Sequence, residues 1–537
     1  MKSFSANFAQ CPCITSADFL SIPESSVYEA AFQKNAALAY SNRHQVHPTL
    51  SQVCSDLALL DDALAHITSI RKRLSQKRSA FQVFSNKLKA LVSPIRIVPP
   101  EIFAEIFSYL KGDYRDKAPA QARTETLLPT HVCQRWREIA LSTPTLWNNI
   151  YINGSSVPKS VRDSEVECTS AWLSRAKDCP LSINLRRSKS WSKDYDFETD
   201  GAWNVIFDML LRRSHRWQHA ILLSTSETDF SGLRNNLPLL ETLEINCPLS
   251  YVEVAGNAFG IAPRLSSVTL SRESGIKILP WAQLKIFVID STLSILESLA
   301  LLQKMPNIVS FSTQISNGWV EARKSVNAPL QMSKLESLSM TEIMPLSVDG
   351  YLTYLKVPSL KSIKIIGNCP LNAASDDWAF ATISMIQRSS CSIESLEVRS
   401  AIWGQSTLAD VLRVTPQLET LDIGSGNVYD SGMAAQVLVA PFGICTPCLA
   451  PKLQHLKLSY WPPFEPQAFV NLVESRWRVA PEGSVTRLSS IKLIDIPSVS
   501  IFGPSDLRRL REFATEGLDI KLNDVEGRLI QIGSTSA

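Results

Sequence analysis

The 537-residue chain has no apolar run of about 18 residues, the length that a membrane-spanning helix needs, so no membrane span is expected. Its first residues, MKSFSANFAQCPC, contain only one basic residue, Lys2, and no apolar core. This start is not that of a secretory signal peptide. We therefore expect a cytoplasmic or nuclear protein in a reducing compartment, whose 11 cysteines are free thiols.

An excess of charge of either sign is also missing. Basic and acidic residues number 54 and 51, which gives a formal net charge of +3. Proteins that bind nucleic acids concentrate basic residues on one face. The balance of charges therefore gives no reason to expect a nucleic-acid partner.

Motifs that carry catalysis or bind metals are few. The chain has no phosphate-binding G-x-x-x-x-G-K-[ST] motif and no G-x-S-x-G motif. Cys445 and Cys448 form one C-x-x-C pair, without the second pair or the histidine cluster that a zinc site needs. His215 and His219 are an incomplete ligand set. We expect no catalytic residue, no metal and no cofactor.

One stretch keeps an enzymatic alternative open. Residues 422–427, DIGSGN, follow a predicted strand and resemble the first motif of a Rossmann-like methyltransferase. Val428 stands where a third glycine would help, and the strand is in phase with a repeat described below. A methyltransferase-like enzyme is therefore the weaker alternative.

A long helix is predicted after an N-terminal arm, residues 1–49, that we expect to be flexible. Residues 50–92 contain no Gly or Pro, and apolar side chains recur every three, four or seven residues, at Leu57, Leu60, Leu64, Ile67, Leu74, Phe81 and Leu88. This spacing predicts an amphipathic, coiled-coil-like helix, unbroken from Leu57 to Leu91. Arg71, Arg78 and Ser85 fall on seam positions. Self-association through this helix, a helix packed on its own chain and a solvated spacer all remain open.

A helical module is predicted for residues 93–152. Pro99 and Pro100 can open a helix because the first turn has free N–H groups in any case. Its apolar face is formed by Ile102, Phe103, Ile106, Phe107 and Leu110, with Gly112 as C-cap. A second helix is predicted from about Leu127 to Leu141, and Pro144 ends it. So small a module is marginally stable alone, so we expect it to dock on a partner.

The motifs of this module resemble an F-box. They are VPPEI from Val98, EIF from Glu105, VCQRWR from Val132 and PTLW from Pro144. The long spacer and the Leu-Trp end are similar to the F-box proteins abundant in mushroom-forming fungi. The resemblance implies a three-helix module that binds the Skp adaptor of a cullin–RING ubiquitin ligase. The polar insert between Gly112 and Thr126 is expected to loop out.

The resemblance also divides the apolar residues between two roles. The adaptor-binding residues would be Val98, Pro99, Ile102, Ile106, Leu110, Leu128 and Val132. The core of the F-box would be formed by Phe107, Trp136, Leu146 and Trp147.

The rest of the chain is predicted to be a linker with a helix, residues 153–180, and then a repeat array, residues 181–537. Helices are expected for Cys168 to Lys177 and Trp203 to Arg213, with strands at Leu181 to Leu185 and His215 to Leu223. A pattern apolar-x-x-apolar-x-apolar then occurs ten times, at spacings of 19 to 35 residues. Its middle residues are Leu243, Val268, Phe287, Phe311, Leu338, Ile363, Leu396, Leu421, Leu456 and Ile491.

This pattern predicts ten parallel strands on one side of an arc, with helices opposite, because no single unit can bury its own apolar face. The units resemble the degenerate leucine-rich repeats that follow F-boxes. The fold class is therefore α/β: a long helix, a helical F-box module and a leucine-rich-repeat-like solenoid. The candidate target-binding residues on the strand surface are Glu244, Thr269, Lys364, Glu397, Asp422 and Lys457.

The function that these resemblances imply is substrate recognition in an SCF-type ubiquitin ligase. The F-box would bind the Skp adaptor, the solenoid would bind an unidentified target protein, and the chain itself would not be an enzyme. The alternative is a non-catalytic repeat scaffold that binds proteins without a ligase role.

Overall fold

A computed structural model describes residues 29, 31–33, 37–38, 40–110, 119–153, 159–186, 201–223, 230–246, 258–270, 279–316, 328–342, 347–367, 377–400, 405–425, 448–459, 465–479 and 485–530. The chain divides into two compact units, residues 1–102 and 103–537, which are described separately. In the described part no helix is both long and apolar enough to cross a membrane.

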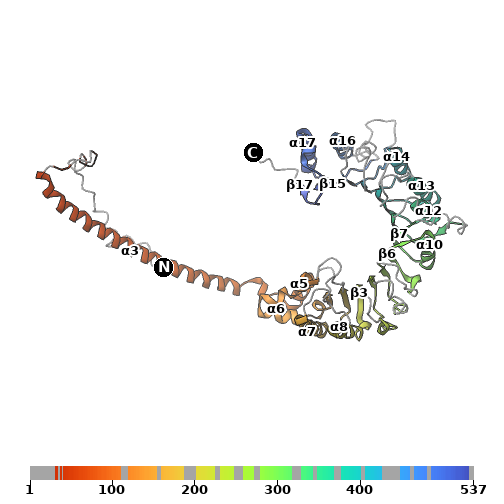
Figure 1. Ribbon diagram of the computed structural model, residues 1–537, viewed down its shortest axis with the longest axis horizontal. Helices are drawn as coiled ribbons and strands as arrows, with labels where there is room; N and C mark the ends of the chain where they lie inside the picture. Colours follow the sequence, from red (N-terminus) through yellow and green to blue (C-terminus); the bar gives the residue numbers. More distant parts are fainter. Residues whose placement is uncertain are drawn as a thin grey trace. The chain divides into compact units, whose positions relative to one another are not determined.

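The first unit is dominated by one helix, α3 (Tyr40–Leu91), of 52 residues (Figure 1). The prediction of an unbroken helix from Leu57 to Leu91 is confirmed. The helix begins ten residues before the predicted start at position 50, so the end of the supposed flexible arm is helical, with Pro48 inside it. None of residues 46–91 is buried. A short 3₁₀ turn, η1 (Pro94–Arg96), follows.

The second unit contains a sheet of 15 described strands, in which successive strands lie side by side. Its strands are β1 (Asn149–Asn153), β2 (Leu181–Arg186), β3 (Trp217–Leu223), β4 (Thr242–Asn246), β5 (Ser267–Leu270), β6 (Ile286–Leu293), β7 (Ser310–Ile315), β9 (Ser337–Glu342), β11 (Ser362–Gly367), β12 (Ser395–Ser400), β13 (Thr420–Ser425), β14 (His455–Ser459), β15 (Ser490–Ile496), β16 (Asp519–Asp524) and β17 (Leu529–Ile530). All described pairs are parallel except β16 with β17. A separate parallel pair is formed by β8 (Leu330–Gln331) and β10 (Leu355–Lys356).

The ten predicted strands are confirmed, and they are in register. Val268 pairs with both Leu243 and Phe287, and the same alignment continues through Phe311 and Leu338 up to Ile491. The two strands predicted before them, β2 and β3, belong to the same sheet. Three strands of this sheet were not predicted, β1 at one end and β16 and β17 at the other, and neither was the separate pair of β8 and β10.

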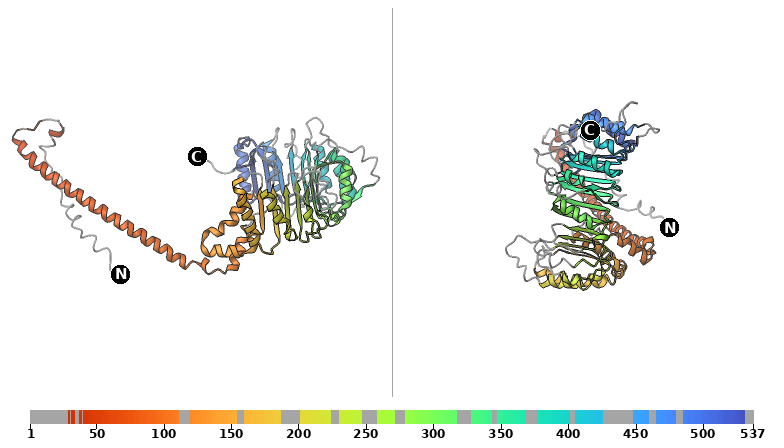
Figure 2. Two further views of the ribbon diagram at one scale, coloured as in Figure 1. Left: turned by 60° about the horizontal axis from the view of Figure 1, so that its bottom comes forward. Right: turned by 90° about the vertical axis from the view of Figure 1, so that its right-hand side faces the viewer.

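Helices connect many of the strands and lie on the outer side of the curved sheet (Figures 1 and 2). They are α7 (Lys159–Arg175), α8 (Gly201–Leu211), α10 (Ile295–Lys304), α12 (Ser347–Thr353), α13 (Asp377–Ser389), α14 (Gln405–Val414), α16 (Pro466–Trp477) and α17 (Pro504–Thr515). The prediction that residues 153–167 form a linker was wrong in part. Helix α7 begins at Lys159, nine residues before the predicted start at Cys168.

The F-box region also differs from its prediction. It contains α4 (Pro100–Ser108), α5 (Pro119–Val132), α6 (Gln134–Ser142) and the 3₁₀ turn η2 (Pro144–Leu146). The single helix predicted from Leu127 to Leu141 is broken at Cys133, an N-cap whose thiol accepts a hydrogen bond from the Trp136 N–H at 3.5 Å. Helix α5 begins inside the insert that was expected to loop out. Gly112 lies outside the described residues.

The core of the second unit lies between the strands and the outer helices. The apolar side chains that alternate along each strand toward the helices are buried; Val268, Phe287 and Phe311 are all 0% exposed. Phe287 and Phe311 stack at a centroid distance of 6.1 Å. Burial of one face by neighbouring units is what the repeat pattern predicts, since a lone unit would leave this layer in water.

Arginines at the ends of outer helices connect neighbouring units. Arg476, the next-to-last residue of α16, donates to the carbonyls of Ala450 at 3.0 Å and Leu449 at 2.6 Å. Arg388 occupies the same position in α13 and donates to the carbonyls of Leu352 and Leu355. Arg476 is 0% exposed, and its burial lowers the pKa of the guanidinium. A buried charge is tolerated when it is hydrogen-bonded, so this side chain fastens α16 to the preceding loop.

The substitution Arg476→Met should lower the free energy of unfolding by about 2–3 kcal/mol, because two buried carbonyl groups lose their charged donor. The matched control is Arg413→Met. Arg413 is also next-to-last in its helix, α14, but its side chain is 62% exposed and pairs with Asp410 of the same helix. Denaturant titration of both variants measures the difference. Equal midpoints for the two variants would contradict the proposed role of the buried arginine.

Candidate functional site

Side chains of α4 and α6 form an aromatic cluster in the second unit. Phe103 and Phe107 on α4 are 2% and 1% exposed. Their rings lie 5.3 and 5.2 Å from the ring of Trp136 on α6. The guanidinium of Arg135 lies 5.4 Å from the Phe103 ring. Of the predicted core residues, Phe107 is thus buried, whereas Trp136 closes the cluster from its edge and is half-buried.

The other two predicted core residues join this cluster's helices to the sheet. Leu146 and Trp147 are both 0% exposed. The indole N–H of Trp147 donates to the carbonyl of Ala140, at the end of α6, at 2.8 Å. Trp217 makes the equivalent bond to Leu210, at the end of α8, at 3.2 Å. In both places a helix is followed by a tryptophan and then by a strand. The tryptophan indole donates to the carbonyl of the residue seven positions earlier, in the helix. The end of the predicted F-box is therefore built like a repeat unit.

An ion pair connects α5 to the first strand and the first outer helix of the sheet. Arg123 on α5 pairs with both carboxylate oxygens of Glu165 on α7 and donates to the carbonyl of Tyr151 on β1. Burial alone would lower the pKa of Arg123, but the hydrogen bond and the charge of Glu165 outweigh it and raise the pKa. The guanidinium therefore holds α5 against the end of the sheet.

Away from this packing, α4 and α5 each present a pair of exposed apolar side chains one turn apart. Ile102 and Ile106 on α4 are 51% and 49% exposed. Leu128 and Val132 on α5 are 49% and 60% exposed. Residues four apart lie on one face of a helix, so each helix buries one side and leaves an apolar side uncovered.

The remaining predicted adaptor-binding residues are less uniform. Pro99 is exposed, whereas Val98 and Leu110 are half-buried. Sequence reasoning missed Tyr109, which is 80% exposed just beyond α4. It belongs to no apolar stripe of the helix, because it follows the last residue, Ser108, and periodicity gave no signal for it.

A second candidate surface is a row of side chains across the strands. All six residues chosen from the sequence lie in this row: Glu244 is opposite Thr269, and Lys364, Glu397, Asp422 and Lys457 follow in register. Lys364 pairs with Glu397 at 2.9 Å, and Lys457 pairs with Asp422 at 2.6 Å. Arg399 bridges Glu397 and Asp422. These charges largely neutralise one another.

The C-terminal end of the row is different. Lys492 on β15 is directly opposite Lys457 on one side and Lys521 on the other. Neighbouring strands are about 4.8 Å apart, and like charges directly opposite one another destabilise a sheet. Lys457 and Lys521 have acidic partners, Asp422 and Asp519, at 2.6 and 2.7 Å. Lys492 therefore lies between two cations at some cost to stability.

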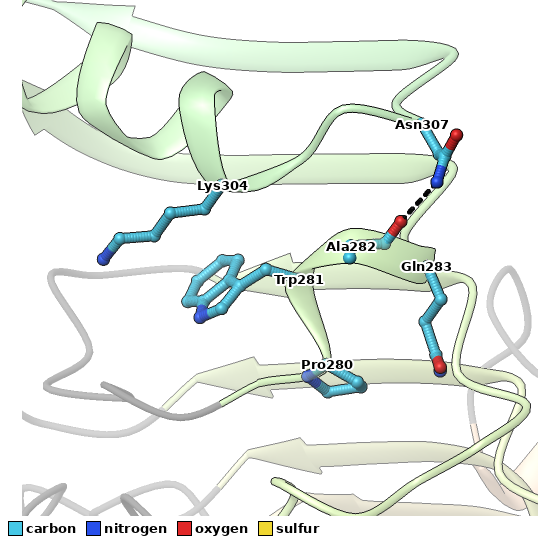
Figure 3. A pocket seen from close by; sticks show the side chains of 6 residues that line it. All are labelled: Pro280, Trp281, Ala282, Gln283, Lys304 and Asn307. Carbon is cyan, nitrogen blue, oxygen red and sulfur yellow. Dashed lines mark hydrogen bonds between the residues drawn. The ribbon is translucent and has the colours of Figure 1, made fainter.

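A depression of about 580 Å³ lies at the turn before β6, lined by Pro280, Trp281, Ala282, Gln283, Lys304 and Asn307 (Figure 3). Its amides are engaged within the chain. Gln283 donates to the carbonyls of Ala262 and Leu265, and Asn307 donates to that of Ala282 at 2.7 Å. Lys304 lies 5.7 Å from the Trp281 ring. These contacts hold neighbouring units together and leave few polar groups for a ligand.

The motifs with possible catalytic or metal-binding roles are described only in part. Asp422 and Gly424 of the methyltransferase-like stretch lie within β13, and residues 426–447, including Cys445, lie outside the described part. His219 bonds to the hydroxyl of Thr242 at 2.9 Å, while His215 is exposed. Among the described residues no three His, Cys, Asp or Glu side chains are placed to hold a metal ion.

Comparison with known families identifies the module. Residues 95–153 match the family model described as F-box-like, and this range contains the aromatic cluster and both exposed pairs. The match supports an F-box protein, a class whose F-box domains generally bind the Skp adaptor of cullin–RING ligases. No curated protein matches the chain.

Replacing Lys492 should test whether Lys457, Lys492 and Lys521 repel one another. Lys492→Thr should raise the free energy of unfolding by about 0.5 kcal/mol at low ionic strength, because two like-charge contacts disappear. In about 1 M salt most of this gain should vanish, since the charges are then screened. Lys452→Thr, at an exposed turn position, is the control and should show no such dependence. A gain that is independent of salt would assign the effect to strand propensity instead.

Proposed function

We propose that this chain is the substrate-recognition subunit of an SCF-type cullin–RING ubiquitin ligase. The F-box-like region, residues 95–153, would bind the Skp adaptor, and the repeat units would hold a target protein. The chain would catalyse nothing itself. It would raise the effective concentration of the target near the ligase by tethering it. Such a complex would act in the cytoplasm or the nucleus.

The observation that carries this proposal is the coincidence of the family match with uncovered apolar side chains. Ile106, Leu128 and Val132 lie inside the matched range and are 49%, 49% and 60% exposed, although their helices have a buried aromatic core nearby. Single exposed apolar residues are ordinary on a protein surface. Several of them within one short matched range are the kind of groups that a docking face uses.

The proposal for the sheet is that its units are degenerate leucine-rich repeats of the kind found after F-boxes in mushroom-forming fungi. Its support is the parallel register of strands spaced by 19 to 35 residues, with helices on the outer side. The target would bind along the strand row, whose side chains are presented by a rigid ladder. The long helix α3 would add self-association to these two contacts.

The substitution Ile106→Ala should weaken binding to the Skp adaptor by about 2 kcal/mol or more if this side chain is a hot spot. The measurement is titration calorimetry of the purified chain with the adaptor, supported by a pull-down. Ile261→Ala is the matched control, because Ile261 is 60% exposed in a turn outside the F-box. It should bind the adaptor as the wild type does.

Point substitutions test adaptor binding more specifically than deletion of the F-box does. Deletion of residues 95–153 would also remove β1 and Trp147, and with them the end of the sheet. Failure of the wild-type chain to bind the adaptor would overturn the ligase proposal and favour a plain protein-binding scaffold. Binding of a methyl donor to the chain would instead favour the enzymatic alternative.

A further inference from the structure

Apolar residues form a continuous line, here called the seam, along the long helix α3. Their spacing has one irregularity. Up to position 67 the apolar residues alternate at steps of three and four: Leu50, Val53, Leu57, Leu60, Leu64 and Ile67. The next step is again three, to Ile70. The alternation then resumes at Leu74, Lys77, Phe81, Phe84, Leu88 and Leu91. Of these 13 positions only Lys77 is polar.

This extra step of three residues is a stammer, an irregularity that locally overwinds a coiled coil without ending it. The stammer also changes which residues occupy the seam after position 67. Arg71, Arg78 and Ser85 are seam residues only if the first register continues. After the stammer they flank the seam, and Ile70, Phe84 and Leu91 take the core positions.

The seam is uncovered in the chain. Nine of its residues are between 41% and 73% exposed, namely Leu50, Leu57, Leu64, Ile67, Leu74, Phe81, Phe84, Leu88 and Leu91. Helices obtain most of their stability from packing of an amphipathic face. A helix of 52 residues with no buried residue between positions 46 and 91 lacks that support, so the seam calls for a partner helix with the same spacing.

We propose that this partner is α3 of a second copy of the chain, and that the two helices run antiparallel. With Leu50 opposite Leu91, the seam matches itself. The further pairs are Val53 with Leu88, Leu57 with Phe84, Leu60 with Phe81, Leu64 with Lys77, and Ile67 with Leu74. Each pair occurs twice, and Ile70 lies beside its copy at the two-fold axis. The Lys77 side chain can extend past Leu64 to water.

The distribution of charge selects this orientation. The acidic residues of the seam region, Asp56, Asp61 and Asp62, all precede position 63, and the Lys and Arg residues all follow position 70. An antiparallel pair places the flanking residue Asp61 against Arg78, and Asp56 against Lys87. A parallel pair in register would place Asp56 against Asp61, and Arg73 against Arg78, in both cases with like charges together.

Such a dimer would set the distance between the two points where the chains leave the coiled coil. The chain leaves each helix at Leu91, and in an antiparallel coil of about 40 residues these exits are about 60 Å apart. Two copies of the target-binding units would then act on one target or on one assembly with avidity. This consequence depends on the proposed ligase role, whereas the dimer itself does not.

The mass of the full-length chain in solution gives the first test. Light scattering at micromolar concentration should give twice 59.6 kDa. Leu74→Glu should give the monomer, because it places a carboxylate in the seam against Ile67 of the second copy. The matched control, Val83→Glu, changes a residue that is 52% exposed but off the seam, and it should leave the dimer intact. Circular dichroism verifies that helix content is kept.

The orientation is tested by Asp61→Arg, whose effect has opposite signs in the two arrangements. In the antiparallel dimer it places the new guanidinium against Arg78, and the dissociation constant should rise about tenfold in low salt. In a parallel dimer it would place the new guanidinium against Asp56 and tighten binding. The double variant Asp61→Arg with Arg78→Asp should restore the affinity.

A wild-type chain that remains monomeric, or an Asp61→Arg variant that dimerises more tightly, would overturn this inference. No adaptor is present in these measurements. In addition, Leu74→Glu should still bind the Skp adaptor, so failure of the dimer is distinguishable from failure of the ligase proposal.

Discussion

Register across the strands is the constraint on which the second unit depends. Strand side chains alternate between two faces, so a slip of one residue would turn an apolar layer toward water and a polar layer toward the helices. From Ile183 through Leu396 to Ile520, the same position of each unit is aligned with its neighbour. The alignment shifts at the start of the β2–β3 pairing, within β6, and within β15, where Asp495 adopts a positive φ of 62°. All three shifts lie outside the aligned positions.

This constraint explains why the F-box and the sheet share one core. Strand β1 begins two residues after Trp147, which is buried against Trp172 on the first outer helix with ring centroids 5.0 Å apart. The F-box therefore supplies the first strand of the ladder, and Arg123 fixes α5 to that strand and to Glu165. The side chain of Arg123 therefore connects α5 to the first strand of the parallel ladder that carries the strand row.

The sequence predicted the features that have a periodic apolar pattern, such as the strands and the long helix, and missed several short features that have none. Ten units share one apolar pattern, so each match supported the others, and the strands were found at their correct positions. Strand β1, in contrast, is a single short segment hidden in the F-box motif. Helix α5 begins at Pro119, and its Arg123 contacts Glu165, which is 42 residues away and invisible to local propensity. The helical periodicity located Ile102 and Ile106 on one side of α4, but Tyr109 lies just outside the helix and followed no period.

The three candidate surfaces differ in whether their side chains already have interaction partners within the chain. In the strand row, Lys364, Glu397 and Asp422 already have ion-pair partners, so a target must replace interactions that exist. The exposed pairs on α4 and α5 and the seam of α3 offer apolar groups, for which water is the only competitor. Contacts there gain free energy without breaking an ion pair. The apolar surfaces would thus suit the proposed constant partners, the adaptor and a second copy, whereas the charged row would suit selection among targets, since a wrong charge opposite it is penalised.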